Sequence, residues 1–409
     1  MRDRPTYLPD PQGHSLHHRT VKREWIPVQG QTNDHTAMLA GVPLREFYTD
    51  ASAFVSAQIS VQSYYGFDSV VFSNDVYNIE AEALGATLVY DTHRMPCVDI
   101  QDPLIKEPSD LGKLKPPDFA QDGRFPYQLE IFRQKRDMGL NQASFCGPAS
   151  LAVALRTYQR FISDLKCNPA FAQELMAFLI GAVTMPYVEH IHRELGITEF
   201  RGSDAVATVP LFAPETLKTV ILPWNLEVIK RGHDMGVNAY VYSPGIYGEQ
   251  VPETVDEGLV RSCYDFSLAS MGKRNMRLCI SRKPEDSLDV FLAYALDLKS
   301  RHPEVPLTIQ IGLYASLLRE GPLERIIYYI KKMLDTFAPT FAVSIAIAGI
   351  SPETPPEHIH AAVQSAHYYG QLPYRFIDDD AAFKPTPRES YVEFVEAVGH
   401  EEKPKSCGS

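Results

Sequence analysis

Short apolar runs rich in β-branched residues alternate along the chain with longer segments of helical periodicity. Eight such runs predict strands, namely Trp25–Gln31, Ser69–Asn74, Gln142–Cys146, Ile197–Arg201, Ala239–Tyr242, Arg277–Ser281, Leu307–Ile311 and Ala342–Ile347. Strands that alternate with helices are typical of a parallel sheet with crossover helices. The pattern predicts an α/β fold, a single (β/α)₈ TIM barrel over residues 21–398. A doubly wound open sheet is the alternative, but no GxGxxG motif follows the first strand.

Helix-start signals support this alternation. Asp50 is placed to cap a helix that runs through Ser63. Proline followed by an acidic residue, a common helix start, opens helical patterns at Pro214, Pro284 and Pro356. Pro322 precedes a further helical pattern, Leu323–Phe337.

Three segments stand outside the alternation. Residues 1–20 are polar and rich in proline and histidine, which predicts a flexible N-terminal arm. Residues 86–138 are proline-rich and predict a long insertion after the second βα unit. The insertion is either a lid over one end of the barrel or an arm used in packing or in a homodimer. Residues 399–409 predict a disordered tail.

Charge and composition narrow the class of partner. The net charge of −12 disfavours nucleic acid and anionic membranes as partners. No apolar run reaches the ~18 residues of a membrane span, and the N-terminus lacks the apolar core of a signal peptide. The six cysteines are scattered without a CxxC pair. These features predict a cytoplasmic protein with reduced thiols.

Polar residues at the predicted strand ends are the candidates for chemistry, because barrel enzymes use the carboxyl ends of their strands. The first strand leads into Asn33, Asp34 and His35, and the second ends in Asn74 and Asp75, followed by Asn78 and Glu80. Asp34 and His35 together suit a base or metal ligands. The alternative for Asp34 is a cap of the following turn.

The third and fourth strands add a thiol and a carboxylate. Cys146, before Gly147-Pro148, is either a ligand or a packed side chain, and packing is favoured. Asp204 follows the fourth strand after Arg201-Gly202-Ser203. It is the strongest catalytic candidate, because packing alone explains a strand-end carboxylate poorly.

Later strands supply aromatic and amide groups. Strand alternation points Tyr240 and Tyr242 to the same side, as aromatic walls with a phenol donor for an apolar ligand or as core tyrosines. The seventh strand offers Gln310 and Tyr314. His190 and His192, in a helical run, are interpreted as surface or packing histidines.

Several motifs, in order, resemble the uroporphyrinogen decarboxylase superfamily. They are the E-A-E-A-L-G-A segment at 80–86, P-L-I at 103–105, L-G-K-L at 111–114, C-G-P-A-S-L-A at 146–152, L-L-R-E-G-P at 317–322 and T-P-P-E-H-I at 354–359. The resemblance spans roughly residues 21–370 and implies a (β/α)₈ barrel. Each motif alone is weak, and their order and spacing carry the specificity.

Two branches of the superfamily fit the residues poorly. True decarboxylases carry an arginine-rich segment after the first strand, but residues 27–35 contain no arginine, so a polycarboxylate should bind weakly. Thiol-methylating members hold zinc through an H-x-C motif and a later cysteine. Tyr242-Ser243-Pro244 and a position near Ala348 stand there instead.

The resemblance therefore points to a corrinoid-dependent methyltransferase similar to the O-demethylase components of anaerobic bacteria. It implies methyl transfer from a small donor, foremost a methoxylated aromatic, to the Co(I) of a separate corrinoid protein. The leaving oxygen needs a proton or a Lewis acid. Candidate proton donors are Tyr242, His35 and Asp204. A bound metal, with zinc as one option, has candidate ligands in Asp34, His35, Asp75, Cys146 and Asp204.

Other functions stay open at this point. They are demethylation of quaternary amines, methyl transfer between a corrinoid and tetrahydrofolate, decarboxylation, and binding of a tetrapyrrole or corrinoid partner without catalysis. The methyltransferase interpretation requires that Asp34, His35, Asp75, Asp204 and Tyr242 converge at one mouth of the barrel.

Overall fold

The computed structural model describes residues 24–75, 77–246, 255–272, 276–280, 288–313, 315–377 and 383–401. The predicted arm at residues 1–20 and the candidate Tyr314 lie outside these ranges.

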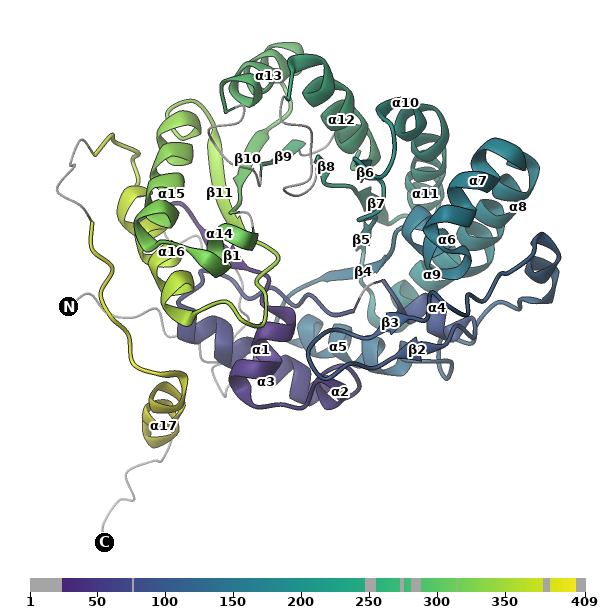
Figure 1. The fold of residues 1–409 in the computed structure, drawn as a ribbon, viewed down its shortest axis with the longest axis horizontal. Helices are drawn as coiled ribbons and strands as arrows, with labels where there is room; N and C mark the ends of the chain where they lie inside the picture. Colours follow the sequence, from purple (N-terminus) through teal and green to yellow (C-terminus); the bar gives the residue numbers. More distant parts are fainter. Residues whose placement is uncertain are drawn as a thin grey trace, which may run out of the picture.

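The long strands form two arcs of parallel sheet on opposite sides of a ring, with helices around the outside (Figure 1). The first arc has the order β1 (Val28–Gly30), β11 (Ala342–Ile347), β10 (Leu307–Ile311) and β9 (Met276–Ile280). The second has the order β4 (Gln142–Cys146), β5 (Glu199–Ser203) and β7 (Asn238–Tyr242). All pairs within both arcs are parallel, as expected for βα units.

Seven of the eight predicted strands are confirmed. The bounds of β4, β10 and β11 agree with the prediction, and the other four differ by no more than three residues at either end. The predicted second strand, Ser69–Asn74, is extended backbone with one bridge, from Ser69 to Gln29 of β1. Among the described residues, hydrogen bonds do not join the two arcs into a continuous ladder.

Helices follow most strands and cover the outside of the ring (Figure 1). The longer ones are α1 (Asn33–Ala40), α3 (Ala51–Tyr65), α5 (Phe125–Asp137), α6 (Pro148–Arg156), α7 (Tyr158–Cys167), α8 (Pro169–Phe178), α9 (Met185–Leu195), α11 (Leu222–Asp234), α12 (Glu257–Ser270), α13 (Leu288–Arg301), α15 (Leu323–Phe337), α16 (Pro356–Tyr369) and α17 (Tyr391–Glu401). The short ones are α2 (Leu44–Phe47), α4 (Ile79–Ala83), α10 (Pro214–Thr216), α14 (Ala315–Glu320), the 3₁₀ turn η1 (Pro108–Lys113), and the π-helical segments η2 (Leu179–Thr184) and η3 (Leu217–Ile221).

The predicted helix starts are largely confirmed. The Asp50 carboxylate accepts a hydrogen bond from the Ala53 amide (2.9 Å) and caps α3. Helix α15 has the predicted bounds, and α16 begins at Pro356. The predicted start at Pro284 lies outside the described residues.

The two faces of the strands differ in polarity. Outward side chains such as Phe145, Phe200 and Val241 are buried beneath helices. Their inward neighbours, such as Ser144 and Arg201, are half-buried and polar. The apolar core therefore lies between strands and helices, and solvent reaches the inward faces of the strands.

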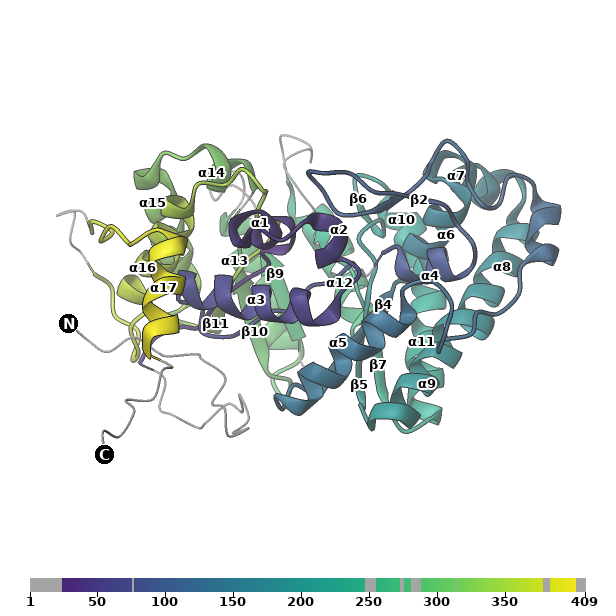
Figure 2. The same cartoon turned by 90° about the horizontal axis from the view of Figure 1, so that it is seen from below.

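The predicted insertion, residues 86–138, contains the antiparallel pair of β2 (Leu88–Val89) and β3 (Cys97–Val98) and the turn η1. Its last part is α5, which packs on β4 like the crossover helix of a βα unit. In Figure 2, β2 lies on the same side of the molecule as α1 and α2.

One continuous helical run, Pro169–Leu195, is long and apolar enough by composition to cross a membrane, with a mean hydropathy of 1.4. However, 61% of its most apolar window is buried inside the protein, so core packing accounts for these apolar side chains. Helix α17 includes residues 399–401 of the predicted tail and packs against α3, where Phe394 contacts Tyr64. A second, short parallel pair joins β6 (Thr208–Val209) to β8 (Gly245–Ile246).

Candidate functional site

Asp204 lies directly after β5 and is fully buried. Its Oδ1 accepts hydrogen bonds from the Ser150 amide (2.8 Å) and the Ser150 hydroxyl (2.7 Å) at the start of α6. Its Oδ2 is buried without a hydrogen-bond partner. Burial raises the pKa of Asp204 to about 6, while the Ser150 hydrogen bonds oppose the shift. The carboxyl group is thus held by one oxygen and leaves the other available to a ligand.

Gly147 makes this arrangement sterically possible. A Cβ atom at Gly147 would overlap both the Cα and the Cβ of Asp204. The Gly147 amide also donates to the Ser203 carbonyl (2.8 Å), which fixes the turn from β4 to α6 against the end of β5. Glycine is therefore required where the two strand ends meet.

Glu80, from α4, is a second buried carboxyl group with one open oxygen. Its Oε1 accepts from the Cys146 amide (2.7 Å), and its Oε2 has no hydrogen-bond partner. Burial raises the pKa of Glu80 to about 7. Burial, followed by the charges of Glu80, Asp204 and Asp75, raises the pKa of the Cys146 thiol well above its ordinary value. Cys146 is therefore a protonated, packed thiol at neutral pH, as the favoured interpretation of this residue holds.

Asp75 is buried but compensated. Arg124 donates to Asp75 Oδ2 (2.6 Å) and, through its Nε, to Glu82 (2.6 Å). The side-chain amide of Asn78 donates to Asp75 Oδ1 (2.6 Å). Burial still raises the pKa of Asp75, although Arg124 opposes the shift. Asp75 thus belongs to an ion-pair network that ties the second strand end to the insertion.

Two asparagines at the strand ends have unsatisfied amide groups. Both polar atoms of the Asn74 side chain and Oδ1 of Asn33 are buried without a hydrogen-bond partner. Nearby, Gln31 donates to the Ser73 hydroxyl (2.6 Å) and joins the first two strand ends. Unsatisfied buried polar atoms are rare and costly, so their presence here indicates a site where a polar ligand would form the missing hydrogen bonds.

Asp34 and His35 are engaged elsewhere. Asp34 accepts from the Tyr48 hydroxyl and from the Met95 amide (3.0 Å). The His35 Nε2 lies 2.5 Å from the Tyr65 hydroxyl, and its Nδ1 lies 3.2 Å from the carbonyl of Ser351 in the loop after β11.

Burial lowers the pKa of His35 and keeps its ring neutral. Asp34 stays electrostatically linked to Asp75 through Tyr48, whose pKa both carboxylates raise after burial. The structure therefore joins Asp34 to the Asp75 network and directs His35 toward a structural contact.

The tyrosines of β7 face inward at different heights. Tyr240 is reached by the Gln142 side chain at the amino end of β4 (3.3 Å), away from Asp204. Tyr242 pairs in register with Ser203 at the carboxyl end. The Arg201 guanidinium lies 4.2 Å from the centre of the Tyr242 ring. Gln310 is half-buried on the inward face of β10, in the other arc.

The candidate metal ligands do not form a metal site. Within the described ranges, no group of three or more His, Cys, Asp or Glu side chains is close enough to hold an ion. Ser243, at the position of the zinc motif, is buried and donates to the Ala207 carbonyl. The residues present therefore do not fit the zinc site of thiol-methylating relatives.

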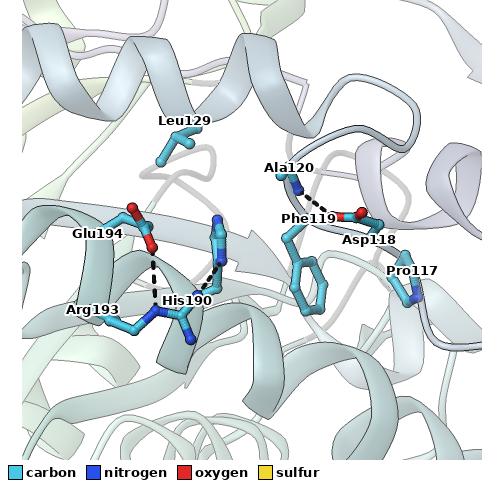
Figure 3. A pocket seen from close by; sticks show the side chains of 8 residues that line it. All are labelled: Pro117, Asp118, Phe119, Ala120, Leu129, His190, Arg193 and Glu194. Carbon is cyan, nitrogen blue, oxygen red and sulfur yellow. Dashed lines mark hydrogen bonds and ion pairs between the residues drawn. The ribbon is translucent and has the colours of Figure 1, made fainter.

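A pocket of about 480 Å³ lies away from these groups (Figure 3). The insertion segment 117–120, Leu129 of α5 and His190, Arg193 and Glu194 of α9 line it. These helices lie outside the strands, and the pocket contains none of the predicted site residues. His190 contacts Arg193, and the His192 Nδ1 lies 2.8 Å from the Ile197 carbonyl. Both histidines therefore have the peripheral places predicted for them.

Sequence reasoning named Glu80 among the polar residues after the second strand but gave it no role, and it gave no role to Arg124 or Arg201. The sequence signal for Glu80 was its position at the start of the E-A-E-A-L-G-A motif, shortly after Asn74 and Asp75. Arg201 was visible as the last residue of the fourth predicted strand. Arg124 gave no signal, because only the folded insertion brings it to Asp75.

Comparisons with known proteins agree with this architecture. The family model for uroporphyrinogen decarboxylase (URO-D) matches residues 25–257. A methyltransferase from Methanosarcina mazei has a similar structure, with a TM-score of 0.64 over 85% of this chain and 95% of that chain, at 18% sequence identity. No curated protein matches the chain. At that identity the structural likeness concerns the fold, whereas the family match covers more than half of the chain and confirms the resemblance inferred from the motifs. The chain therefore belongs to the uroporphyrinogen decarboxylase family.

Proposed function

We propose that this protein is a corrinoid-dependent methyltransferase. In this proposal it transfers a methyl group from a small methylated donor, foremost a methoxylated aromatic, to the Co(I) of a separate corrinoid protein. The proposal also treats the two arcs as parts of one closed (β/α)₈ barrel. The bridge between Gln29 and Ser69, which extends the first arc toward β4, supports that geometry.

The observation that carries the proposal is the state of Asp204. A buried carboxyl group with a pKa of about 6, one oxygen fixed by Ser150 and the other without a partner, suits a general acid. Glu80 adds a second such group with a pKa of about 7. The similarity in fold to a methyltransferase is consistent with this chemistry.

The reaction assigns a defined task to these residues. Removing a methyl group from an ether leaves an alkoxide or phenolate, which is a poor leaving group unless its oxygen receives a proton. Asp204 Oδ2 would donate that proton, and Ser150 would hold the resulting carboxylate through Oδ1. Glu80, with a pKa of about 7, would be partly protonated near pH 7 and would therefore add little negative charge to the site.

His35 and Tyr242 are less suited to this step. Both His35 ring nitrogens have partners, and burial holds the ring in its neutral form. The Tyr242 ring presents its face to the Arg201 guanidinium. We therefore assign proton donation to Asp204 alone.

The corrinoid of a partner protein would supply the nucleophile that accepts the methyl group. Access for it requires an open carboxyl end, and Ser203 and Tyr242 there are only half-buried. The described side chains do not fit a zinc site, so we derive no step through zinc.

Methyl transfer from methoxylated aromatics to reduced cobalamin, followed by absorbance, tests the proposal. We expect transfer with the native protein and its loss in Asp204→Asn. Carbon dioxide release from uroporphyrinogen without methyl transfer would instead establish a decarboxylase. Tight binding of a corrinoid protein with neither reaction would establish a binding protein.

A further inference from the structure

We propose that Arg201 and Tyr242 form a recognition site for a single carboxylate on the methyl donor. This inference rests on the proposed function and deepens it, because it names a chemical group that the substrate must carry.

Arg201 points into the ring of strands. On β5, its neighbours Phe200 and Gly202 face outward, where Phe200 is buried and Gly202 is against Phe145. Arg201 therefore faces inward, in register with Ser144 of β4 and Tyr240 of β7. Its guanidinium stacks on Tyr242, one inward row closer to the carboxyl end. The cation is thus directed toward the end of the strands that carries Asp204.

The charge of Arg201 has no counterion among the described residues, and its Nε is buried without a hydrogen-bond partner. The two most buried arginines with ion pairs provide the contrast. Arg124 is paired with Asp75 and Glu82, and Arg156 is paired with Asp164 (2.8 Å). Arg201 is only half-buried, but its buried Nε cannot be hydrogen-bonded by bulk solvent and lacks the partner that a buried polar group normally has. Arg201 is therefore an arginine whose partner the fold does not provide.

Tyr242 prepares the arginine for an anion. The guanidinium carbon of Arg201 lies 4.2 Å from the centre of the Tyr242 ring, and no described residue accepts a hydrogen bond from the guanidinium N–H groups. The planar fork of an arginine matches a carboxylate through two parallel hydrogen bonds. The tyrosine ring also provides an apolar surface for the body of the same ligand.

Among the described inward residues of β1, β4, β5, β7, β10 and β11, Arg201 is the one cation, which fits a ligand with a single carboxylate. Residues 27–35 after the first strand contain no arginine or lysine. A substrate with several carboxylates would leave the others unpaired beside Glu80 and Asp204. A quaternary ammonium donor would meet the Arg201 charge directly, so this site disfavours the amine alternative.

Calorimetric binding of benzoate and its neutral isostere benzamide, without any corrinoid protein, tests the site directly. We expect the native protein to bind benzoate more tightly than benzamide. Arg201→Gln should weaken benzoate binding about 10- to 100-fold, the range of a charge-assisted hydrogen-bonded pair, and leave benzamide within about 3-fold. Arg201→Lys, which keeps the charge but loses the fork, should fall between the two.

Ser344→Ala is the matched control, because Ser344 is a half-buried, inward-facing residue of β11 in the opposite arc. It should leave both affinities unchanged. An absence of benzoate binding, or an equal loss of benzoate and benzamide in Arg201→Gln, would overturn the inference. Circular dichroism melting of each variant separates a folding defect from a binding defect.

Methyl transfer separates this inference from the proposed function. With methoxybenzoate as donor, Arg201→Gln should raise KM by the same 10- to 100-fold, and with methoxybenzamide it should not. Transfer that proceeds equally from both donors and ignores Arg201 would refute the carboxylate site and keep the methyltransferase. Benzoate binding that depends on Arg201, with no transfer from any donor, would keep the site and refute the methyltransferase.

Discussion

The two arcs of the sheet carry different chemistry on their inward faces. The arc of β4, β5 and β7 leads to Cys146 and Asp204 and carries Arg201 and Tyr242. In the other arc, the described inward residues of β1, β10 and β11 are neutral: Gln29, Thr308, Gln310, Ala342, Ser344 and Ala346. Both arcs share a parallel register and an apolar outer face, so the fold alone does not dictate the difference.

This contrast indicates a division of roles. Ionisable groups that are only partly satisfied gather on one arc and at its junction with the second strand end, where Glu80 and Asn74 lie. The described inward residues of β1, β10 and β11 are uncharged. This arrangement fits a reaction in which the arc of β4, β5 and β7 binds an anionic donor and protonates its leaving oxygen.

Asp204→Asn should have the largest effect. The amide keeps an oxygen that can accept from Ser150 but cannot act as an acid, so we expect methyl transfer to fall about 10²- to 10⁴-fold. The measurement is single-turnover methyl transfer at saturating donor. Ser344→Ala, the control in the neutral arc, should stay within about 3-fold, and an equal loss in both variants would remove the proposed difference between the arcs.

Arg124→Met tests whether Asp75 is structural. Removing the cation leaves Asp75 buried without its counterion, and breaking a buried ion pair in this way typically costs about 3–5 kcal/mol. Chemical denaturation should show that loss in the free energy of unfolding. The double variant Arg124→Met with Asp75→Asn should recover part of it. A stability unchanged by Arg124→Met would show that the network is not structural.

Glu80→Gln should alter the dependence of stability on pH. The pKa of Glu80 is raised from 4.5 to about 7 in the folded protein, so folding favours its protonated form. This contribution is fully present below pH 4.5 and is lost as the pH rises through 7.

Glu80→Gln should therefore be more stable than the native protein above pH 7, by on the order of 3 kcal/mol, and should lose stability less steeply between pH 4.5 and 7. Urea denaturation across this range measures the effect. Parallel pH profiles for both proteins would contradict the assigned state of Glu80.

Tyr242→Phe should have the smallest effect. The ring that stacks on Arg201 is retained, so the rate of methyl transfer should change less than about 5-fold. Tyr242→Leu removes the ring and should weaken benzoate binding further. A loss in Tyr242→Phe as large as that in Asp204→Asn would make the phenol, and not the carboxyl group, the proton donor.

Hydrophobic periodicity was sufficient for most of the fold. The strands Leu307–Ile311 and Ala342–Ile347 and the helix Leu323–Phe337 have strong local patterns, and the structure reproduces them, as it does the weaker strand pattern of Gln142–Cys146. The second strand, Ser69–Asn74, was less predictable, because its backbone pairs with a side chain as well as with a strand: the Val71 amide donates to the Gln62 side-chain oxygen (2.7 Å). The extent of the insertion depends on where α5 packs, which no local pattern encodes.

The sequence supplied candidate residues for the site, but it could not supply the contacts that those residues make. Strand-end reasoning selected Asp204, Asn74 and Asp75, which the structure buries: Asp204 and Asn74 have unsatisfied polar atoms, and Asp75 is paired with Arg124. It could not foresee that Tyr65 and the loop after β11 would satisfy His35, since those contacts span up to 317 residues. Long-range partners decide whether a polar side chain is structural or available.

The most direct test of Asp204 as the proton donor varies the leaving group. Single-turnover methyl transfer can compare a methoxybenzoate with a nitro-substituted methoxybenzoate, whose phenolate leaves with little need for a proton. If Asp204 donates the proton, Asp204→Asn should lose about 10²-fold or more with the first donor and less than about 10-fold with the second. An equal loss with both donors would contradict a role for Asp204 in proton transfer.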